Sequence, residues 1–312
     1  MKFLGNVLAV IVGLFAFSIV ALVIVFALLG MVAASSEKEV TLEENSILHL
    51  DLNGRILVER TSEEDLAFGS FLDPFGGDNS AGLVNLKKAI AEAKTNENIK
   101  GIYLNAGLFG AGQAGLLELR EALQDFKESG KFIVAYDEAY TEGGYFLASV
   151  ADEIYLNPLG GIDFNGFSSE GIFLKGFFEK VGIKPEVFRV GEFKSAVEPF
   201  ILDKMSPENR LQTQYFLDDI NRHAIDLIAE SRKIAKDSLI KINHQMLVRK
   251  PKDAVTYKLA TALKYEDEVH SILKEKLGLN EEDQISTINA TDLGGLAKSK
   301  NITSPNRIAV IL

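Results

Sequence analysis

The start of the chain is far more apolar than the rest. Residues 3–36 contain no charged side chain, and residues 7–32 are almost wholly Leu, Val, Ile, Ala and Phe. About 20 apolar residues are enough to cross the hydrocarbon core of a bilayer, and the backbone there must be helical to satisfy its own hydrogen bonds. The pattern therefore predicts a membrane-spanning helix within residues 1–36.

The alternative for this segment is a cleaved signal peptide. Val32-Ala33-Ala34 resembles a small-residue cleavage site, but the apolar core of a signal peptide spans only about 7–15 residues. The longer run favours an uncleaved anchor. Lys2 lies on the short side of the run, and positive charge prefers the cytoplasmic side. In a bacterium, we therefore expect a single pass through the cytoplasmic (inner) membrane, with the large domain on the outer, periplasmic side.

After residue 45, the apolar residues follow two alternating patterns. Runs typical of strands occupy 46–54, 99–107, 131–137, 152–158 and 184–190. Segments with helical spacing occupy 83–94, 115–130, 142–151, 171–182, 206–234 and most of 252–278. Strands that alternate with helices at this spacing indicate βαβ units around a parallel sheet, which is the α/β class. Residues 59–80, rich in Gly, Asp and Ser, predict a loop.

The last residues look like the start of a second, similar domain. Residues 281–305 are polar and contain Gly, Ser and Asn, so they predict a linker. The strand-like run 306–312 breaks off within its apolar stretch and resembles residues 45–52, which open the first domain. An internal repeat explains this pattern; the alternative is a short terminal strand that joins the first sheet. The expected division is an anchor at 1–36, a first domain at 37–280, a linker, and a second domain truncated within its first strand.

Composition removes several classes of function. The net charge is −11, whereas nucleic-acid binding needs clustered basic side chains, so we expect no nucleic-acid partner. The chain has no cysteine, which excludes disulfides and a thiol nucleophile. The four histidines, His49, His223, His244 and His270, are scattered without metal-ligand spacing. We therefore expect no zinc site and no histidine-based catalytic site.

Two glycine-rich turns are candidates for chemistry. Residues 105–115 lie between a predicted strand and a predicted helix, where backbone N–H groups can bind an anion, but the glycines lack dinucleotide-binding spacing. A plain tight turn is the simpler interpretation. Glu142-Gly143-Gly144 lies where a strand enters a helix, a geometry suited to a nucleophile. A carboxylate is a poor nucleophile for acyl transfer, so an acid that stabilises a helix start is the simpler interpretation of Glu142.

Lys194 is the third candidate. It lies within FRVGEFKSAVEPF (188–200), next to Phe193. A lysine that acts as a general base must be neutral near pH 7, and apolar surroundings can lower its pKa from about 10.4. Glu192 and Glu198 would oppose that shift if they pointed inward. By residue type alone, a solvated surface lysine is the more common outcome.

A longer motif around Lys194 changes this view. The segment 189–207, RVGEFKSAVEPFILDKMSP, resembles the N-terminal half of the long form of the signal peptide peptidase A (protease IV) family. IYLNAG, GGYFLAS, DEIYLNPLGGIDFNGF and GIFLKGFFEKVGIKPEVFRVG occur before it in the same order as in that family. The resemblance covers essentially the whole chain, which corresponds to about the first half of the family's protein. It implies a crotonase-like (ClpP-like) domain of repeated ββα/βαβ units behind an N-terminal transmembrane helix.

The resemblance also implies a mechanism. The family's proteins are serine peptidases with a Ser/Lys dyad, and Lys194 matches the general base. The nucleophilic serine belongs to the second domain, before a Gly-Gly turn, and here it would lie beyond Leu312. Glu142 at the corresponding turn fits a first domain without a nucleophile. The family further implies cleaved signal peptides as substrates, a bilayer contact, and a homotetramer in which lysine and serine meet across a subunit boundary. The family's mechanism requires neither a cofactor nor a metal.

Two alternatives remain at this stage. The chain could be a non-catalytic, membrane-tethered assembly domain, or an acyl-CoA enzyme of the same fold. An acyl-CoA enzyme would need a basic pocket for the adenine nucleotide, and the sequence contains no such basic cluster. A strand–helix–strand repeat ending in Ser-Gly-Gly beyond Leu312 would favour the peptidase, whereas a stop codon there would favour the assembly domain.

Overall fold

The computed structural model describes residues 2–35, 42–59 and 80–299. The chain divides into two compact units, 1–41 and 42–312. The first unit contains one long helix, α1 (Lys2–Ser35). Within the described part of the chain, no helix combines the length and the apolar character that crossing a membrane requires.

A parallel sheet forms the centre of the second unit. Its strands are β1 (Ser46–Asp51), β4 (Ile99–Asn105), β5 (Phe132–Tyr140), β6 (Glu153–Ile162), β7 (Ala262–Leu263) and β8 (Thr287–Asn289). They lie in the order β7-β6-β5-β4-β1-β8, and every neighbouring pair is parallel. A second sheet pairs β2 (Ile56–Val58) with β3 (Ser80–Gly82), also in parallel. The predicted α/β class with a parallel sheet is confirmed.

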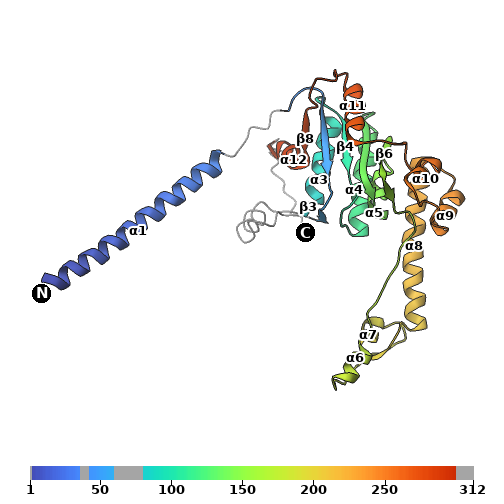
Figure 1. Cartoon of the computed structure of the whole chain (residues 1–312), viewed down its shortest axis with the longest axis horizontal. Coiled ribbons are helices and arrows are strands. Elements are labelled where there is room, and N and C mark those ends of the chain that lie inside the picture. The colour runs from blue at the N-terminus through green and yellow to red at the C-terminus, as the bar shows by residue number, and fades with distance from the viewer. Residues whose placement is uncertain (1, 36–41, 60–79, 300–312) are drawn as a thin grey trace, which may run out of the picture. The chain divides into compact units, whose positions relative to one another are not determined.

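Helices connect these strands (Figure 1). They are α3 (Leu83–Thr95), α4 (Gln113–Lys127), α5 (Glu142–Ala148), α6 (Lys175–Lys180), the 3-10 turn η1 (Ser195–Val197), α7 (Glu198–Ile201), α8 (Pro207–Arg232), α9 (Lys236–His244), α10 (Pro251–Thr256), α11 (Glu266–Leu277) and α12 (Ala290–Ser299). The helix start at Ser206-Pro207 follows from the sequence, because the Ser206 side chain accepts a hydrogen bond from the Asn209 N–H and Pro207 suits the first helical position.

Both faces of the central sheet are buried. On one face, Ile47 and Tyr103 pack in a cluster with Val269 and Leu273 of α11. Successive side chains of a strand point to opposite faces. Leu48, next to Ile47, is fully buried as well. A sheet covered on both faces explains why its strands read as apolar runs rather than as alternating patterns.

One predicted strand is wrong. Residues 184–190 belong to no helix or strand. Phe188 and Val190 in this segment are 93% and 90% exposed. An apolar, β-branched composition favours a strand only where another strand is available to pair with it, and the described residues around this segment provide none.

The linker prediction for 281–305 also needs correction. Residues 287–299 in this interval form β8 and α12. β8 adds a parallel strand beside β1, with Ile288 opposite Leu48, and α12 packs on α3. Ile288 and Leu293 supply the buried apolar contacts within an otherwise polar stretch. Of the loop predicted over 59–80, residues 60–79 lie outside the described residues, and Ser80 begins β3. The strand predicted over 306–312 also lies outside the described residues.

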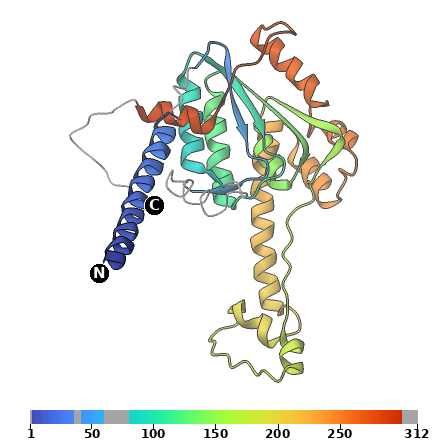
Figure 2. The ribbon, with the colours of Figure 1, turned by 60° about the vertical axis from the view of Figure 1, so that its left-hand side comes forward.

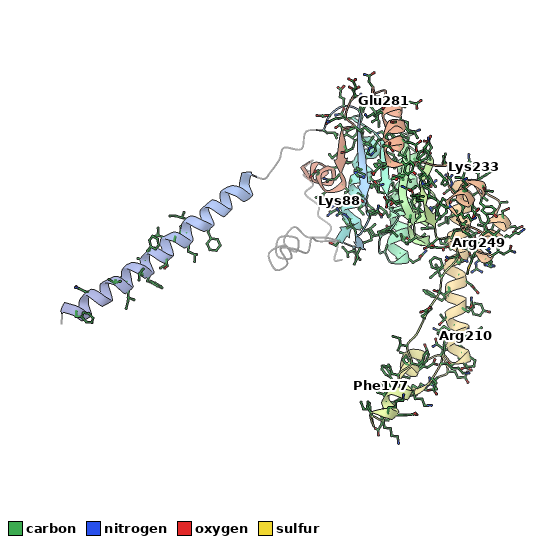
Figure 3. All side chains as sticks on the ribbon, viewed as in Figure 1. Lys88, Phe177, Arg210, Lys233, Arg249 and Glu281 are labelled. Carbon is green, nitrogen blue, oxygen red and sulfur yellow. The ribbon has the colours of Figure 1, made fainter. Side chains whose placement is uncertain are left out.

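A projecting segment carries the Lys194 motif. We call residues 171–216 the arm; it comprises α6, η1, α7 and the first part of α8, and it lies at the end of α8 that is distant from the sheet (Figures 1 and 2). Phe177 and Arg210 mark the arm in Figure 3. The opposite end of α8 packs against the domain through Ala224, Ile225 and Ile228.

The arm exposes many large apolar side chains. Those with more than half of their surface exposed include Ile172, Phe177, Phe188, Val190, Tyr215 and Phe216. Many exposed large apolar side chains on one segment are typical of a surface that another protein covers.

Candidate functional site

The Gly-Gly turn joins the end of β5 to the start of α5. Thr141 caps the helix, because its hydroxyl accepts a hydrogen bond from the Gly144 N–H at 3.1 Å. A Cβ atom on Gly144 would lie 2.3 Å from the Ala106 carbonyl oxygen and 2.5 Å from that of Gly107. Glycine is therefore needed at position 144 for α5 to approach the loop that follows β4.

Glu142 occupies the first position of α5 and is held from three directions. Its Oε2 accepts hydrogen bonds from the backbone N–H groups of Asn165 at 2.9 Å and Gly166 at 3.1 Å, and its Oε1 accepts one from Asn243 Nδ2 at 3.2 Å. Asn243 Oδ1 accepts in turn from Asn221 Nδ2 of α8 at 2.9 Å. Burial raises the pKa of Glu142 despite these hydrogen bonds. These contacts support the interpretation of Glu142 as a structural acid.

The glycine-rich loop at 105–115 is tied down by its neighbours. The Gly107 N–H donates to Asp137 Oδ2 at 2.7 Å, and the Leu108 N–H donates to Asn53 Oδ1 at 2.9 Å. Asn53 Nδ2 donates to the same Asp137 carboxylate at 2.9 Å. Burial raises the pKa of Asp137 to about 6. Because these two amides already have acceptors within the protein, the loop reads as a tight turn rather than as an anion site.

Arg120 is a buried cation that no sequence pattern singles out. Its Nη1 donates to the Phe146 carbonyl and, at 2.7 Å, to Ser149 Oγ. Its Nη2 donates to the Leu227 carbonyl at 2.9 Å and to Ser231 Oγ at 2.6 Å. Burial lowers the pKa of Arg120 to about 10. The guanidinium thus joins α4 and α5 to the C-terminal part of α8, the helix whose first part belongs to the arm.

Lys194 lies on the arm and is exposed to solvent. It immediately precedes η1, and its backbone carbonyl accepts a hydrogen bond from Arg189 Nη1 at 3.2 Å. The neighbouring Phe193 is 52% exposed. In this chain, the apolar residues beside Lys194 therefore do not bury its amine.

Glu198 lies four residues after Lys194, and its side chain is fully buried. Its Oε1 accepts from Ser206 Oγ at 2.5 Å, and its Oε2 accepts from Asn209 Nδ2 at 2.9 Å and from the Ser206 N–H at 3.2 Å. Burial alone would raise the pKa of Glu198, but these hydrogen bonds and the nearby Arg189 hold it below its ordinary value. From the sequence, Ser206 can be recognised as a helix cap. No sequence pattern indicates that its hydroxyl donates a hydrogen bond to Glu198.

The structure does not bring the two sequence candidates together. Glu142 contacts α8 through Asn243 and Asn221, whereas Lys194 lies near the helix start at Ser206. Fifteen residues of helix separate Ser206 from Asn221, which corresponds to about 22 Å along its axis. Among the residues that the structure describes, no cluster of acidic or histidine side chains is suited to hold a metal ion.

Comparison with known proteins identifies the family. Residues 125–280, half of the chain, match the profile of peptidase family S49. The chain belongs to peptidase family S49. The matched residues include both the Gly-Gly turn with Glu142 and the arm with Lys194.

Curated relatives of this S49 chain are proteases. Protease 4 of Haemophilus influenzae is 34% identical over 229 residues, which cover 72% of this chain and 37% of the relative. Protease 4 of Salmonella typhi is 35% identical over 199 residues, covering 62% and 32%. The chloroplastic serine protease SPPA of Arabidopsis thaliana is 29% identical over 218 residues, covering 69% and 32%. The chain thus spans about a third of the length of the curated relatives it matches.

Two solved structures of one protease align with part of the chain. The membrane-bound stomatin-specific protease 1510-N aligns with a TM-score of 0.40 and 13% sequence identity, and the alignment covers 78% of this chain and 97% of that one. A second structure of 1510-N, in complex with a substrate peptide, aligns with the same score.

Proposed function

We propose that this chain is the first part of a membrane-anchored serine peptidase and that Lys194 is its general base. The observation that carries the proposal is the separation of the Gly-Gly turn from Lys194. Glu142 stands where the Gly-Gly turn would hold a nucleophile, and its carboxylate is engaged by Asn165, Gly166 and Asn243. Lys194 is exposed at the distant end of the arm. A lysine base and a serine nucleophile must therefore meet through a second domain or a second subunit.

The nucleophile is proposed to lie beyond Leu312. Support comes from the length of the relatives, of which this chain matches 32–37%. In the same proposal, the second domain repeats the crotonase-like fold and carries a serine before its own Gly-Gly turn. The oxyanion is stabilised by backbone N–H groups of that domain.

Lys194 needs a covering surface to act as a base. A lysine acts as a general base only as the neutral amine, and contact with water favours the ammonium form of any lysine. Burial against apolar groups favours the neutral amine, and the exposed Phe188, Val190 and Phe193 lie within six residues of Lys194 in the chain. We propose that another subunit of a homotetramer packs on the arm and completes this environment. The many exposed apolar side chains of the arm support that role.

The proposed reaction follows from a neutral Lys194 amine. The amine accepts the proton of the serine hydroxyl while the serine oxygen attacks the peptide carbonyl. The resulting ammonium donates that proton to the leaving amine as the peptide C–N bond breaks. Water then attacks the acyl-serine ester, with Lys194 again accepting a proton and returning it to the serine oxygen. Positioned acid–base groups of this kind contribute about 10²–10⁴-fold to the rate.

The proposed location and substrates rest on the N-terminal sequence. Residues 3–36 carry no charge. This sequence pattern, rather than any described helix, supports the proposed single-pass anchor with the domain on the periplasmic side. A peptidase held beside the bilayer would encounter apolar peptides released there. Cleaved signal peptides are therefore the proposed substrates. Protease treatment of spheroplasts tests the topology: the domain is degraded if it lies outside and protected if it lies inside.

Substitution of Lys194 in the longer protein tests the proposed base. Lys194→Ala and Lys194→Arg should each lower kcat for an apolar peptide by at least about 10³-fold, because neither side chain can accept a proton near pH 7. Lys204→Ala, at another exposed lysine of the arm, is the matched control and should retain activity. Full activity in Lys194→Ala would overturn the assignment and favour a non-catalytic assembly role for this domain.

A further inference from the structure

Glu198 is a buried carboxylate on an otherwise exposed arm, and the reaction does not use it. Its side chain is fully shielded from solvent, whereas Phe188, Val190 and Phe193 nearby are largely exposed. An unpaired buried carboxylate is costly, so its position must be fixed by donors. Every polar contact of Glu198 comes from the segment that carries Lys194 or from the start of α8.

The first set of contacts joins Glu198 to α8. The Ser206 hydroxyl donates to Glu198 Oε1 and accepts from the Asn209 N–H at 3.1 Å, so one hydroxyl caps the helix and holds the carboxylate. The Ser206 N–H and the Asn209 side chain donate to Oε2. A carboxylate near the first turn is also favoured by the helix dipole. These contacts fix α7 to the N-terminal end of the longest helix in the second unit's described residues.

The second set joins Glu198 to the Lys194 backbone. Arg189 Nη1 lies 3.8 Å from Glu198 Oε1 and donates to the Lys194 carbonyl at 3.2 Å. Gly191, between Arg189 and Lys194, has a φ of +100°, a conformation that favours glycine and folds the chain back. Arg189 thus bridges the carboxylate and the backbone from which the Lys194 side chain extends.

Together, the two sets form a continuous path from α8 to Lys194. We propose that Glu198 is a positioning residue, which holds the Lys194 turn on the start of α8 so that the amine meets its partner in one fixed place. The path runs from Ser206 and Asn209 to Glu198, then through Arg189 to the Lys194 carbonyl. The inference rests on the proposed function, because positioning matters only if Lys194 transfers protons.

The chemistry explains why a carboxylate is required. An ionised glutamate is an acceptor with two oxygens, so it can receive all of these donors at once. A glutamine would direct an NH₂ group at one of them and leave the Arg189 charge without a counter-ion. Displacement of a catalytic group by about 1 Å can cost about 10²-fold in rate. A displaced amine slows proton transfer, which belongs to the chemical step, so the loss should appear in kcat rather than in KM.

The test uses the longer protein with Glu198→Gln, Glu198→Asp and a matched control, Glu192→Gln. Glu192 is an exposed glutamate two residues before Lys194. We expect Glu198→Gln to lower kcat by about 10–100-fold with KM within about twofold. Glu198→Asp keeps the charge and should recover much of the loss, and Glu192→Gln should match the wild type. Asn209→Ala removes a single donor and gives a milder variant, with an intermediate loss, should Glu198→Gln fail to fold.

Several results would overturn the inference. Wild-type kcat in Glu198→Gln and Asn209→Ala would show that the contacts do not position the lysine. Circular dichroism and sedimentation measure the fraction of each variant that is folded and assembled. If the loss of kcat equals the loss of folded, assembled protein, Glu198 has only a structural role. Lys194→Ala is assayed in parallel. If that variant stays active, the proposed function itself fails; if it is inactive while Glu198→Gln is fully active, only the positioning role fails.

Discussion

Glu142 provides the sharpest stability prediction, because the neighbouring amides can change orientation. In Glu142→Ala, the Gly166 N–H and the buried Asn243 amide lose their acceptor, while the exposed Asn165 N–H can turn to water. A buried polar group without a partner costs about 1–3 kcal/mol. Relief from burying the carboxylate offsets part of this cost. We expect the free energy of unfolding to fall by about 2–4 kcal/mol.

Glu142→Gln should behave differently. The glutamine oxygen can keep both backbone N–H groups, and its NH₂ group then faces Asn243. If the Asn243 amide flips, its oxygen accepts that hydrogen bond and its NH₂ group faces Asn221. Asn221 Oδ1 is buried without a partner, so a flip of Asn221 brings that oxygen into the chain of hydrogen bonds. The number of hydrogen bonds is conserved, and we expect a loss below about 1 kcal/mol.

Urea unfolding of the 312-residue chain in mild detergent measures both variants. Far-UV circular dichroism is a suitable signal, since the chain has no tryptophan. Glu282→Gln, at an exposed glutamate, is the control for the loss of one charge. Equal destabilisation by Gln and Ala would contradict the flipping amides, and no destabilisation by Ala would contradict a structural role for Glu142.

Three further predictions concern the same domain. Burial raises the pKa of Asp137 from 3.8 to about 6, so the folded state binds the proton more tightly than the unfolded state does. The free energy of unfolding should therefore fall by an amount on the order of 3 kcal/mol as the pH rises from about 4 to 6. Asp137→Asn should remove this slope from urea titrations, and an unchanged slope would count against the buried carboxyl. Gly144→Ala should cost about 3 kcal/mol or more, because its Cβ would meet the Ala106 and Gly107 carbonyl oxygens, whereas Gly143→Ala should cost under about 1 kcal/mol. Finally, purified residues 1–312 should hydrolyse no peptide, and turnover by this chain would indicate a nucleophile within it.

The sequence predicted four of the six strands of the central sheet, β1, β4, β5 and β6, because each is a local run of mostly apolar residues. Runs such as 99–107 and 131–137 are mostly apolar, which is typical of strands covered on both faces, and the structure has β4 and β5 there. The start of α8 was equally clear from Ser206 and Pro207. Signals of this kind depend only on residues close together in the sequence.

Elements that depend on distant partners were predicted poorly. Residues 184–190 have a strand-like composition but no strand to pair with in the described arm. β8 is only three residues long and exists because β1 lies beside it. The contacts of Glu142 with Asn243 and of Glu198 with Asn209 likewise join positions that no sequence spacing relates. Lys194 itself was found only through the motif around it, since its exposed position is that of an ordinary lysine.

The central claim is that Lys194 serves a serine outside this chain. Labelling of the longer protein with a fluorophosphonate, which reacts with activated serines, tests it directly when the labelled peptide is mapped by mass spectrometry. We predict one labelled serine beyond residue 312, and loss of the label in Lys194→Ala. A labelled serine within residues 1–312, or undiminished labelling in Lys194→Ala, would contradict the account.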